Sequence, residues 1–289
     1  MTQRPRGIDR IYPALPASDG AGVRLKRSIG TPGLDHLDPF LMLDQFDTEN
    51  ADDYIAGFPE HPHRGFETVT YMIAGLMRHE DNTGAGGVLR PGGVQWMTPG
   101  RGIVHSEMPE QQDGQMKGFQ LWVNLPARDK MTPPRYQNIE PEDVPEITRD
   151  DGVTVRVIAG AFDGVDGAVV GIAVDPVYLD VTLPAGVSVS FPVPADHAGF
   201  IYPFEGAVEI PAEDGSDPVL VADSHLGVLG DGDVLTVCGA ADAAAADGGR
   251  FILVAGHPIN EPISRYGPFV MNTREEIVQA VHDFQAGKF

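Results

Sequence analysis

The segment HPHRGFETVTYMIAG, residues 61–75, says more about the fold than any other part of the sequence. It places His61 and His63 directly before Phe66–Ile73, a run rich in the aromatic and β-branched residues that favour strands. Side chains alternate between the two faces of a strand, so residues at positions i and i+2 project from the same face. The segment therefore predicts a β-sheet in which two imidazoles are directed to one side.

A second pair with the same spacing lies in GGVQWMTPGRGIVHSEMP, residues 92–109. Here His105 and Glu107 follow a strand-like run and a Pro-Gly turn signal. If the strands that carry the two pairs are neighbours, four ligand atoms converge. Three imidazoles and one carboxylate suit iron, manganese, copper, nickel or zinc. A single His-x-His pair is more typical of a surface, but the two pairs together favour a metal site.

The rest of the chain has the pattern of short strands separated by turns. Its 289 residues include 35 glycines and 25 prolines, which is typical of many strands joined by turns. A second strand-rich block has its clearest strands at residues 153–158, 177–183, 200–202, 207–210 and 234–237. Residues 240–249 are expected to form a surface loop. Because so many antiparallel strands would leave exposed edges, we predict an all-β protein with two closed or sandwich-like barrels.

The distribution of these signals predicts three parts. Residues 1–133 are expected to form an N-terminal barrel that carries the metal, and residues 147–289 a C-terminal barrel without one. Between them, residues 134–146 belong to a stretch rich in proline and acidic residues, which favours an extended linker.

One helix is expected, at about residues 273–286. Thr273 is a good N-cap residue, and Glu276 three positions later completes a capping box. An apolar stripe at helical spacing follows, formed by Ile277, Ala280, Val281 and Phe284. We expect this helix to pack on a barrel.

Composition narrows the possible partners and location. The formal net charge of −22 argues against direct binding to nucleic acid, because the chain should repel a phosphate backbone. Cys238 is the only cysteine, so no disulfide can form within the chain and a reducing compartment fits. The longest apolar stretch, around Ala168–Val174, is too short to span a bilayer, and the N-terminus has no signal-peptide pattern. We therefore expect a cytoplasmic protein with no membrane partner.

Five longer segments resemble the pirin family of the cupin superfamily. They are DPFLMLD from Asp38, HPHRGFETVTY from His61, GGVQWMTPGRGIVHSEMP from Gly92, FQLWVNLP from Phe119 and YGPFVMNTREEI from Tyr266. These segments are spread over nearly the whole chain. The resemblance implies two cupin barrels in tandem, each a double-stranded β-helix or jelly roll, with a short C-terminal helix.

The resemblance also implies a ligand set. Pirins bind one iron ion, as Fe²⁺ or Fe³⁺, in the N-terminal barrel, although other divalent metals fit the same ligands. Carried over to this sequence, the ligands are His61, His63, His105 and Glu107. Many other cupins use a glutamate at the position of Glu67 instead, so here Glu67 is left to orient an imidazole or to support the structure. His79 is expected on a solvated hairpin, and its role is open.

The activity implied by the resemblance is that of a flavonol (quercetin) 2,3-dioxygenase. Such an oxidoreductase would use one non-haem iron, dioxygen and a small aromatic substrate, with Glu107 as the general base. The alternative is a non-enzymatic, iron-dependent, redox-sensing regulator that binds transcription factors or metabolic enzymes. A zinc-dependent sugar isomerase of the cupin superfamily is a third possibility, but its features are not evident in the sequence.

Overall fold

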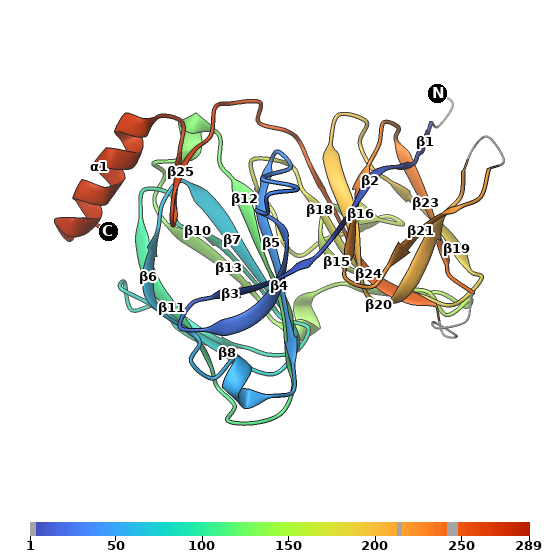
Figure 1. Cartoon of the computed structure of the whole chain (residues 1–289), viewed down its shortest axis with the longest axis horizontal. Helices are drawn as coiled ribbons and strands as arrows, with labels where there is room; N and C mark the ends of the chain where they lie inside the picture. Colours follow the sequence, from blue (N-terminus) through green and yellow to red (C-terminus); the bar gives the residue numbers. More distant parts are fainter. Residues whose placement is uncertain (1–3, 213–215, 242–247) are drawn as a thin grey trace. The chain divides into compact units, whose positions relative to one another are not determined.

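The computed structural model describes residues 4–212, 216–241 and 248–289 (Figure 1). Regular structure in these residues consists of β-strands, three short 3-10 turns and one α-helix. The predominance of strands and the single helix are as the sequence predicts. None of the described helices is long and apolar enough to cross a membrane. Most of the expected surface loop at residues 240–249 lies outside the described residues. Two compact units are present, which we call the first barrel and the second barrel.

The first barrel consists of Leu15–Asp143 and Ile259–Phe289. One antiparallel sheet has the strand order β13 (Arg135–Ile139), β10 (Val94–Thr98), β7 (Phe66–Ala74), β12 (Met116–Asn124), β5 (Phe40–Thr48), β4 (Val23–Ile29) and β3 (Leu15–Asp19). A second antiparallel sheet has the order β6 (Phe58–His63), β11 (Ile103–Pro109), β8 (Met77–Asp81) and β9 (Gly86–Leu89). Both expected metal-ligand pairs lie on this smaller sheet, on β6 and β11.

The second barrel consists of the N-terminal residues through Ala14 and of Val144–Pro258. Its large sheet contains β1 (Pro5–Arg6), β2 (Ile8–Pro13), β14 (Glu146–Thr148), β15 (Thr154–Ala159), β18 (Val177–Leu183), β19 (Ser188–Pro192), β20 (Ala198–Ile210), β21 (Val219–Ala222), β22 (His225–Leu229), β23 (Val234–Gly239) and β24 (Gly249–Gly256). A two-stranded ribbon adds β16 (Ala161–Phe162) and β17 (Val165–Asp166). The interior is filled by one large cluster of valine, leucine, isoleucine and phenylalanine side chains.

The first and the last segment of the chain each belong to the other barrel than the one expected from the sequence. β1 and β2, expected in the first barrel, pair with β23 and β22 of the second. The residues after Pro258, expected in the second barrel, pack in the first, where they form β25 (Ser264–Tyr266), β26 (Phe269–Met271) and the helix. The expected linker also differs, because its residues include β13, which pairs with β10. Composition cannot reveal such pairings, since each joins residues far apart in the sequence.

The helix α1 spans Arg274–Gln285, and the Thr273 side chain and Glu276 form the predicted capping box. Ile277 and Ala280 are buried against Phe269 and Met271 of β26. The helix therefore packs its apolar face on β26, as its stripe predicts, and its Asp283 pairs with Arg64 of the first barrel at 2.9 Å.

Candidate metal centre

The two predicted ligand pairs lie side by side because β6 and β11 are antiparallel neighbours. His105 is opposite His61, and Ile103 is opposite His63. The register shifts between His105 and Glu107, so the carboxylate is displaced from the regular alternation of the strand. After His63 the chain turns sharply at Gly65, where φ is +86° and a β-carbon would overlap the carbonyl of Val270. Only glycine fits this turn, which sends the chain into β7.

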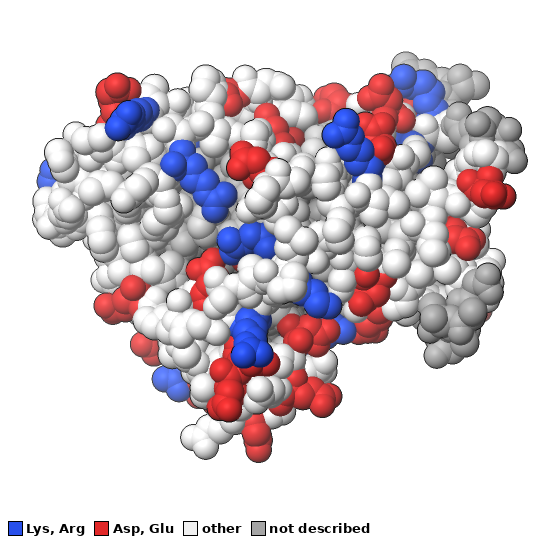
Figure 2. Space-filling view, viewed as in Figure 1, with Lys and Arg blue, Asp and Glu red and all other residues white. Residues whose placement is uncertain are grey.

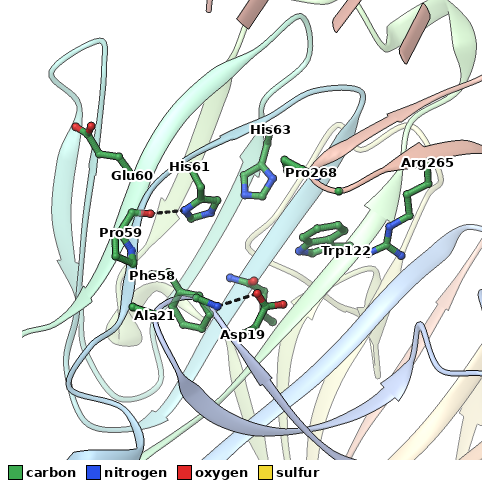
Figure 3. A pocket seen from close by; sticks show the side chains of 13 residues that line it. Asp19, Ala21, Phe58, Pro59, Glu60, His61, His63, Trp122, Arg265 and Pro268 are labelled. Carbon is green, nitrogen blue, oxygen red and sulfur yellow. Dashed lines mark hydrogen bonds between the residues drawn. The ribbon is translucent and has the colours of Figure 1, made fainter. Parts of the chain in front are cut away.

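The three imidazoles converge. One ring nitrogen from each of His61, His63 and His105 lies within 4.8 Å of the others. The Nε2 atoms of His61 and His105 are 3.0 Å apart. His63 and His105 are only 2% and 1% exposed, whereas His61 is half-buried at the edge of a pocket (Figure 3). The predicted cluster of three histidines is therefore present in the structure.

The imidazoles are suited to bind a cation. Burial lowers the pKa of His105 to about 4 and lowers the pKa of His63 well below its ordinary value. Both rings are therefore neutral near pH 7 and keep a free lone pair, as metal ligation requires. His61 Nδ1 donates to the carbonyl of Pro59 at 2.8 Å, which leaves its Nε2 as the acceptor. The Nδ1 atoms of His63 and His105 are buried and have no hydrogen-bond partner among the described residues.

Glu107 is buried next to this cluster but lies outside the group of ligand atoms within 4.8 Å. Its Oε1 accepts from Thr70 Oγ1 and its Oε2 from Gln120 Nε2, each at 2.8 Å. Burial raises the pKa of Glu107, but His105, His61 and the two hydrogen bonds outweigh it and hold the pKa below its ordinary value. The side chain is therefore an ionised carboxylate held in place beside the imidazoles.

His79 differs from the expectation of a solvated hairpin residue. It is only 3% exposed, lies on β8 opposite Glu107, and stacks on Tyr136 with ring centroids 6.0 Å apart. The sequence holds a signal for this position, because Met77 and His79 alternate with the polar Arg78 and Glu80 as expected of a half-buried strand. His79 therefore belongs to the buried polar surroundings of the candidate metal centre.

Glu67 is buried on β7, but it does not orient an imidazole. Its carboxylate accepts from Trp96 Nε1 at 3.1 Å and from Thr98 Oγ1 at 2.6 Å. Both donors come from the neighbouring strand β10. Of the two roles left open for Glu67, these contacts correspond to structural support.

A pocket of about 460 Å³ reaches the candidate metal centre from one side (Figure 3). Besides His61 and His63, its wall contains Asp19, Gly20, Ala21, Phe58, Pro59, Glu60, Gln120, Trp122, Arg265, Gly267 and Pro268. Arg265, Gly267 and Pro268 come from the C-terminal segment and were not anticipated, because local sequence does not indicate that this segment returns to the first barrel. Gln120 links the pocket wall to Glu107 through its hydrogen bond.

Comparisons with known proteins agree with this arrangement. The Pirin family model matches residues 22–123, and the model of the Pirin C-terminal cupin domain matches residues 178–289. A Pseudomonas aeruginosa protein named "Putative quercetin 2,3-dioxygenase" is 51% identical over 98% of both chains. Human pirin is 44% identical over 94% of this chain and 89% of its own length. The crystal structure of a quercetin 2,3-dioxygenase from Acinetobacter baumannii superposes with a TM-score of 0.86 at 33% identity, covering 98% of both chains.

These relatives span nearly the full length of the chain, and the fold consists of two cupin barrels in tandem. The first barrel holds a cluster of three histidines that could bind a metal. Sequence, fold and site agree, and the chain belongs to the pirin family of bicupins.

Proposed function

We propose that this protein is a metal-dependent dioxygenase that acts on flavonols or similar small aromatic compounds. The observation that carries the proposal is the open pocket whose wall includes two of the three clustered imidazoles, His61 and His63. A relative of 51% identity and a solved structure of 33% identity both bear the name quercetin 2,3-dioxygenase. A buried metal with no access for a substrate would instead favour a structural role.

The metal in this proposal is one iron ion held by His61, His63, His105 and Glu107. Three imidazoles and one carboxylate form a ligand set that suits iron and other divalent transition metals. When bound, iron would supply open coordination positions and redox chemistry with dioxygen. The low pKa values of His63 and His105 keep these ligands deprotonated at neutral pH.

Glu107 is also the proposed general base. It is ionised, and its Oε1 accepts a hydrogen bond from Thr70 while its Oε2 accepts one from Gln120. Because Gln120 lines the pocket, Oε2 is the carboxylate oxygen linked to the substrate side. A substrate hydroxyl that enters the pocket would transfer its proton to this oxygen.

The pocket wall fits a flat, largely apolar substrate. Phe58, Trp122 and Pro268 contribute apolar surface, and the volume of about 460 Å³ lies in the range of small-molecule sites. Burial of the aromatic substrate against these side chains would exclude water from the region beside Glu107. The polar groups at the imidazole end would then orient the hydroxyl that loses its proton.

The test combines metal analysis with oxygen uptake. Protein from unsupplemented cells is analysed for metal, loaded with ferrous iron, and assayed with a panel of flavonols. Oxygen consumption that depends on both iron and flavonol is expected, with Glu107→Gln at least about a hundredfold slower because base catalysis contributes roughly 10²–10⁴. Arg128→Gln, on the surface away from the pocket, serves as the control.

The alternative is an iron-dependent redox-sensing regulator, and it depends on the same ligands. Iron-loaded protein that consumes no oxygen with any flavonol, and whose Glu107→Gln variant behaves identically, would contradict the enzymatic proposal. A set of bound proteins that differs between the ferrous and ferric forms would then support the regulator.

A further inference from the structure

Arg265 lies in the wall of the same pocket, yet its guanidinium has no carboxylate partner. It belongs to β25, and its Nη1 donates to the carbonyl of Leu41 at 3.3 Å. Within the described parts of the chain, no carboxylate oxygen lies at ion-pair distance from it. The sequence has 42 acidic and only 20 basic residues, so acidic partners are plentiful. The unpaired charge is therefore available to a ligand in the pocket.

Two of the carboxylates whose charges act on Arg265, Asp19 and Asp44, are already bound by another arginine. Asp19 lines the pocket, but it accepts from Arg27 Nη2 at 2.8 Å and from its neighbour's backbone, Gly20 N, at 2.8 Å. Asp44 accepts two bonds from Arg27, at 2.7 and 2.6 Å. Arg27 thus takes the side-chain hydrogen bonds of these two acids, and they, like Asp35, act on Arg265 through their charge and not through a hydrogen bond.

Trp122 connects this charge to the candidate metal centre. Its ring centroid is 5.5 Å from that of His63, and the Cζ of Arg265 is 4.8 Å from the indole ring. Figure 3 shows Arg265 on the far side of Trp122 from His61 and His63. The indole Nε1 is buried and unpaired within the described residues. The indole therefore lies between the imidazoles and the cation, and all of these groups except His105 line the pocket.

We propose that Arg265 and Trp122 form a specificity subsite for an anionic group at the remote end of a planar aromatic substrate. The class of ligand is an aromatic compound with a carboxylate or ionised phenol at this end. This inference rests on the proposed function in one respect, which is that the opposite end of the substrate faces His61 and His63. A guanidinium binds a carboxylate through charge-assisted, often bidentate hydrogen bonds. Trp122, whose ring contacts Phe66 and Arg265, holds the guanidinium at the pocket wall.

A matched pair of ligands tests the subsite: 3-hydroxyflavone and its 4′-carboxylate. Binding to the nickel-loaded full chain is measured by calorimetry without oxygen, so that the readout is affinity and not turnover. The wild type should prefer the carboxylate by about tenfold or more, as a hydrogen bond to a charged group implies. Arg265→Gln should abolish that preference while it changes the affinity for 3-hydroxyflavone by less than about fivefold, the size of a cation–π contact. Arg265→Lys should keep part of the preference.

Arg128→Gln is the matched control, because it removes the same charge from a side chain that is 75% exposed and paired with Asp129. It should keep the preference of the wild type. Equal loss of preference in both variants would mean that net charge, and not a subsite, selects the anion. An Arg265→Gln variant that still prefers the carboxylate would also overturn the proposal.

A second pair of probes separates this proposal from the proposed function. The affinities of 2-naphthoate and 2-naphthamide for metal-free wild type and Arg265→Gln are compared. If no flavonol binds but the wild type alone prefers 2-naphthoate, the subsite stands and the flavonol function falls. The subsite falls if flavonols are consumed but the wild type and Arg265→Gln bind 2-naphthoate and the flavone 4′-carboxylate equally well. It also falls if the wild type binds neither of these two carboxylates.

Discussion

The two barrels are built from the same kind of antiparallel sheet, but different side chains fill them. The second barrel is packed with aliphatic and aromatic side chains. Of the buried polar and charged side chains in the described residues, all but Arg6, Asp180 and His197 belong to the first barrel. Burial of a polar group costs free energy unless it is paired, and in the first barrel the Nδ1 atoms of His63 and His105 are buried without a partner among the described residues. The interior of the second barrel consists mainly of packed apolar side chains.

The largest expected effect on stability is therefore in the second barrel. Phe251 on β24 is fully buried and lies 6.0 Å from Phe191, measured between ring centroids. Phe251→Ala should lower the free energy of unfolding by about 3–5 kcal/mol, because the cavity adds to the lost burial. Urea denaturation measures this change. Leu220→Ala, at an edge-strand position that is 53% exposed, should stay within about 0.5 kcal/mol. Similar losses in both variants would contradict the packing role.

The second largest expected effect is a loss of metal affinity in the first barrel. His105→Ala removes the most buried of the clustered imidazoles and should lower metal affinity by at least about a hundredfold, since even outer-shell partners contribute 10–100-fold. Calorimetric titration with ferrous or nickel ions measures it. His225→Ala, in the second barrel, is the matched control and should bind metal as the wild type does. An unchanged affinity in His105→Ala would exclude this residue as a ligand.

A smaller effect should appear as a pH dependence of the metal-free protein. Burial lowers the folded-state pKa of His105 to about 4, below its ordinary value of 6.5. Between these values the unfolded chain binds more protons than the folded protein, so stability rises with pH. The metal-free protein should therefore lose stability as the pH falls from 6.5 towards 4. Denaturation at several pH values should show a shallower slope for His105→Asn, and an equal slope would contradict the assignment.

The smallest expected effect is at the helix. Thr273 Oγ1 accepts from the backbone of Glu276, so Thr273→Ala should cost about 1 kcal/mol. Thr273→Ser keeps the hydroxyl and should restore most of this loss in a denaturation experiment. Because α1 belongs to the first barrel, hydrogen exchange should increase in the helix and not in β20 or β24 of the second barrel. Faster exchange in those strands would contradict this division of the chain.

Local sequence was enough to predict the features that depend on local geometry. The alternation of side chains along a strand predicted that His61 and His63 share a face, and the same rule would also have predicted that His79 is buried. The capping box at Thr273 was equally local. Strand composition and turn residues were sufficient for the all-β class.

The features that sequence reasoning missed depend on contacts between distant residues. The return of the C-terminal segment brings Arg265 beside Trp122, and nothing in the composition near either residue indicates it. The hydrogen bonds of Glu107 to Thr70 and Gln120 likewise join three separate strands. Neither the pocket nor its positive end could be located before the strand order was known.

The proposed function depends on one metal ion bound by His61, His63, His105 and Glu107. Anomalous diffraction at the metal absorption edge, on crystals of protein loaded with a single equivalent, tests it most directly. We expect one peak, in the first barrel, from an ion bound by three imidazole nitrogens and the carboxylate of Glu107. A peak in the second barrel or no bound metal at all would contradict it, as would a first-barrel ion that Glu107 does not contact.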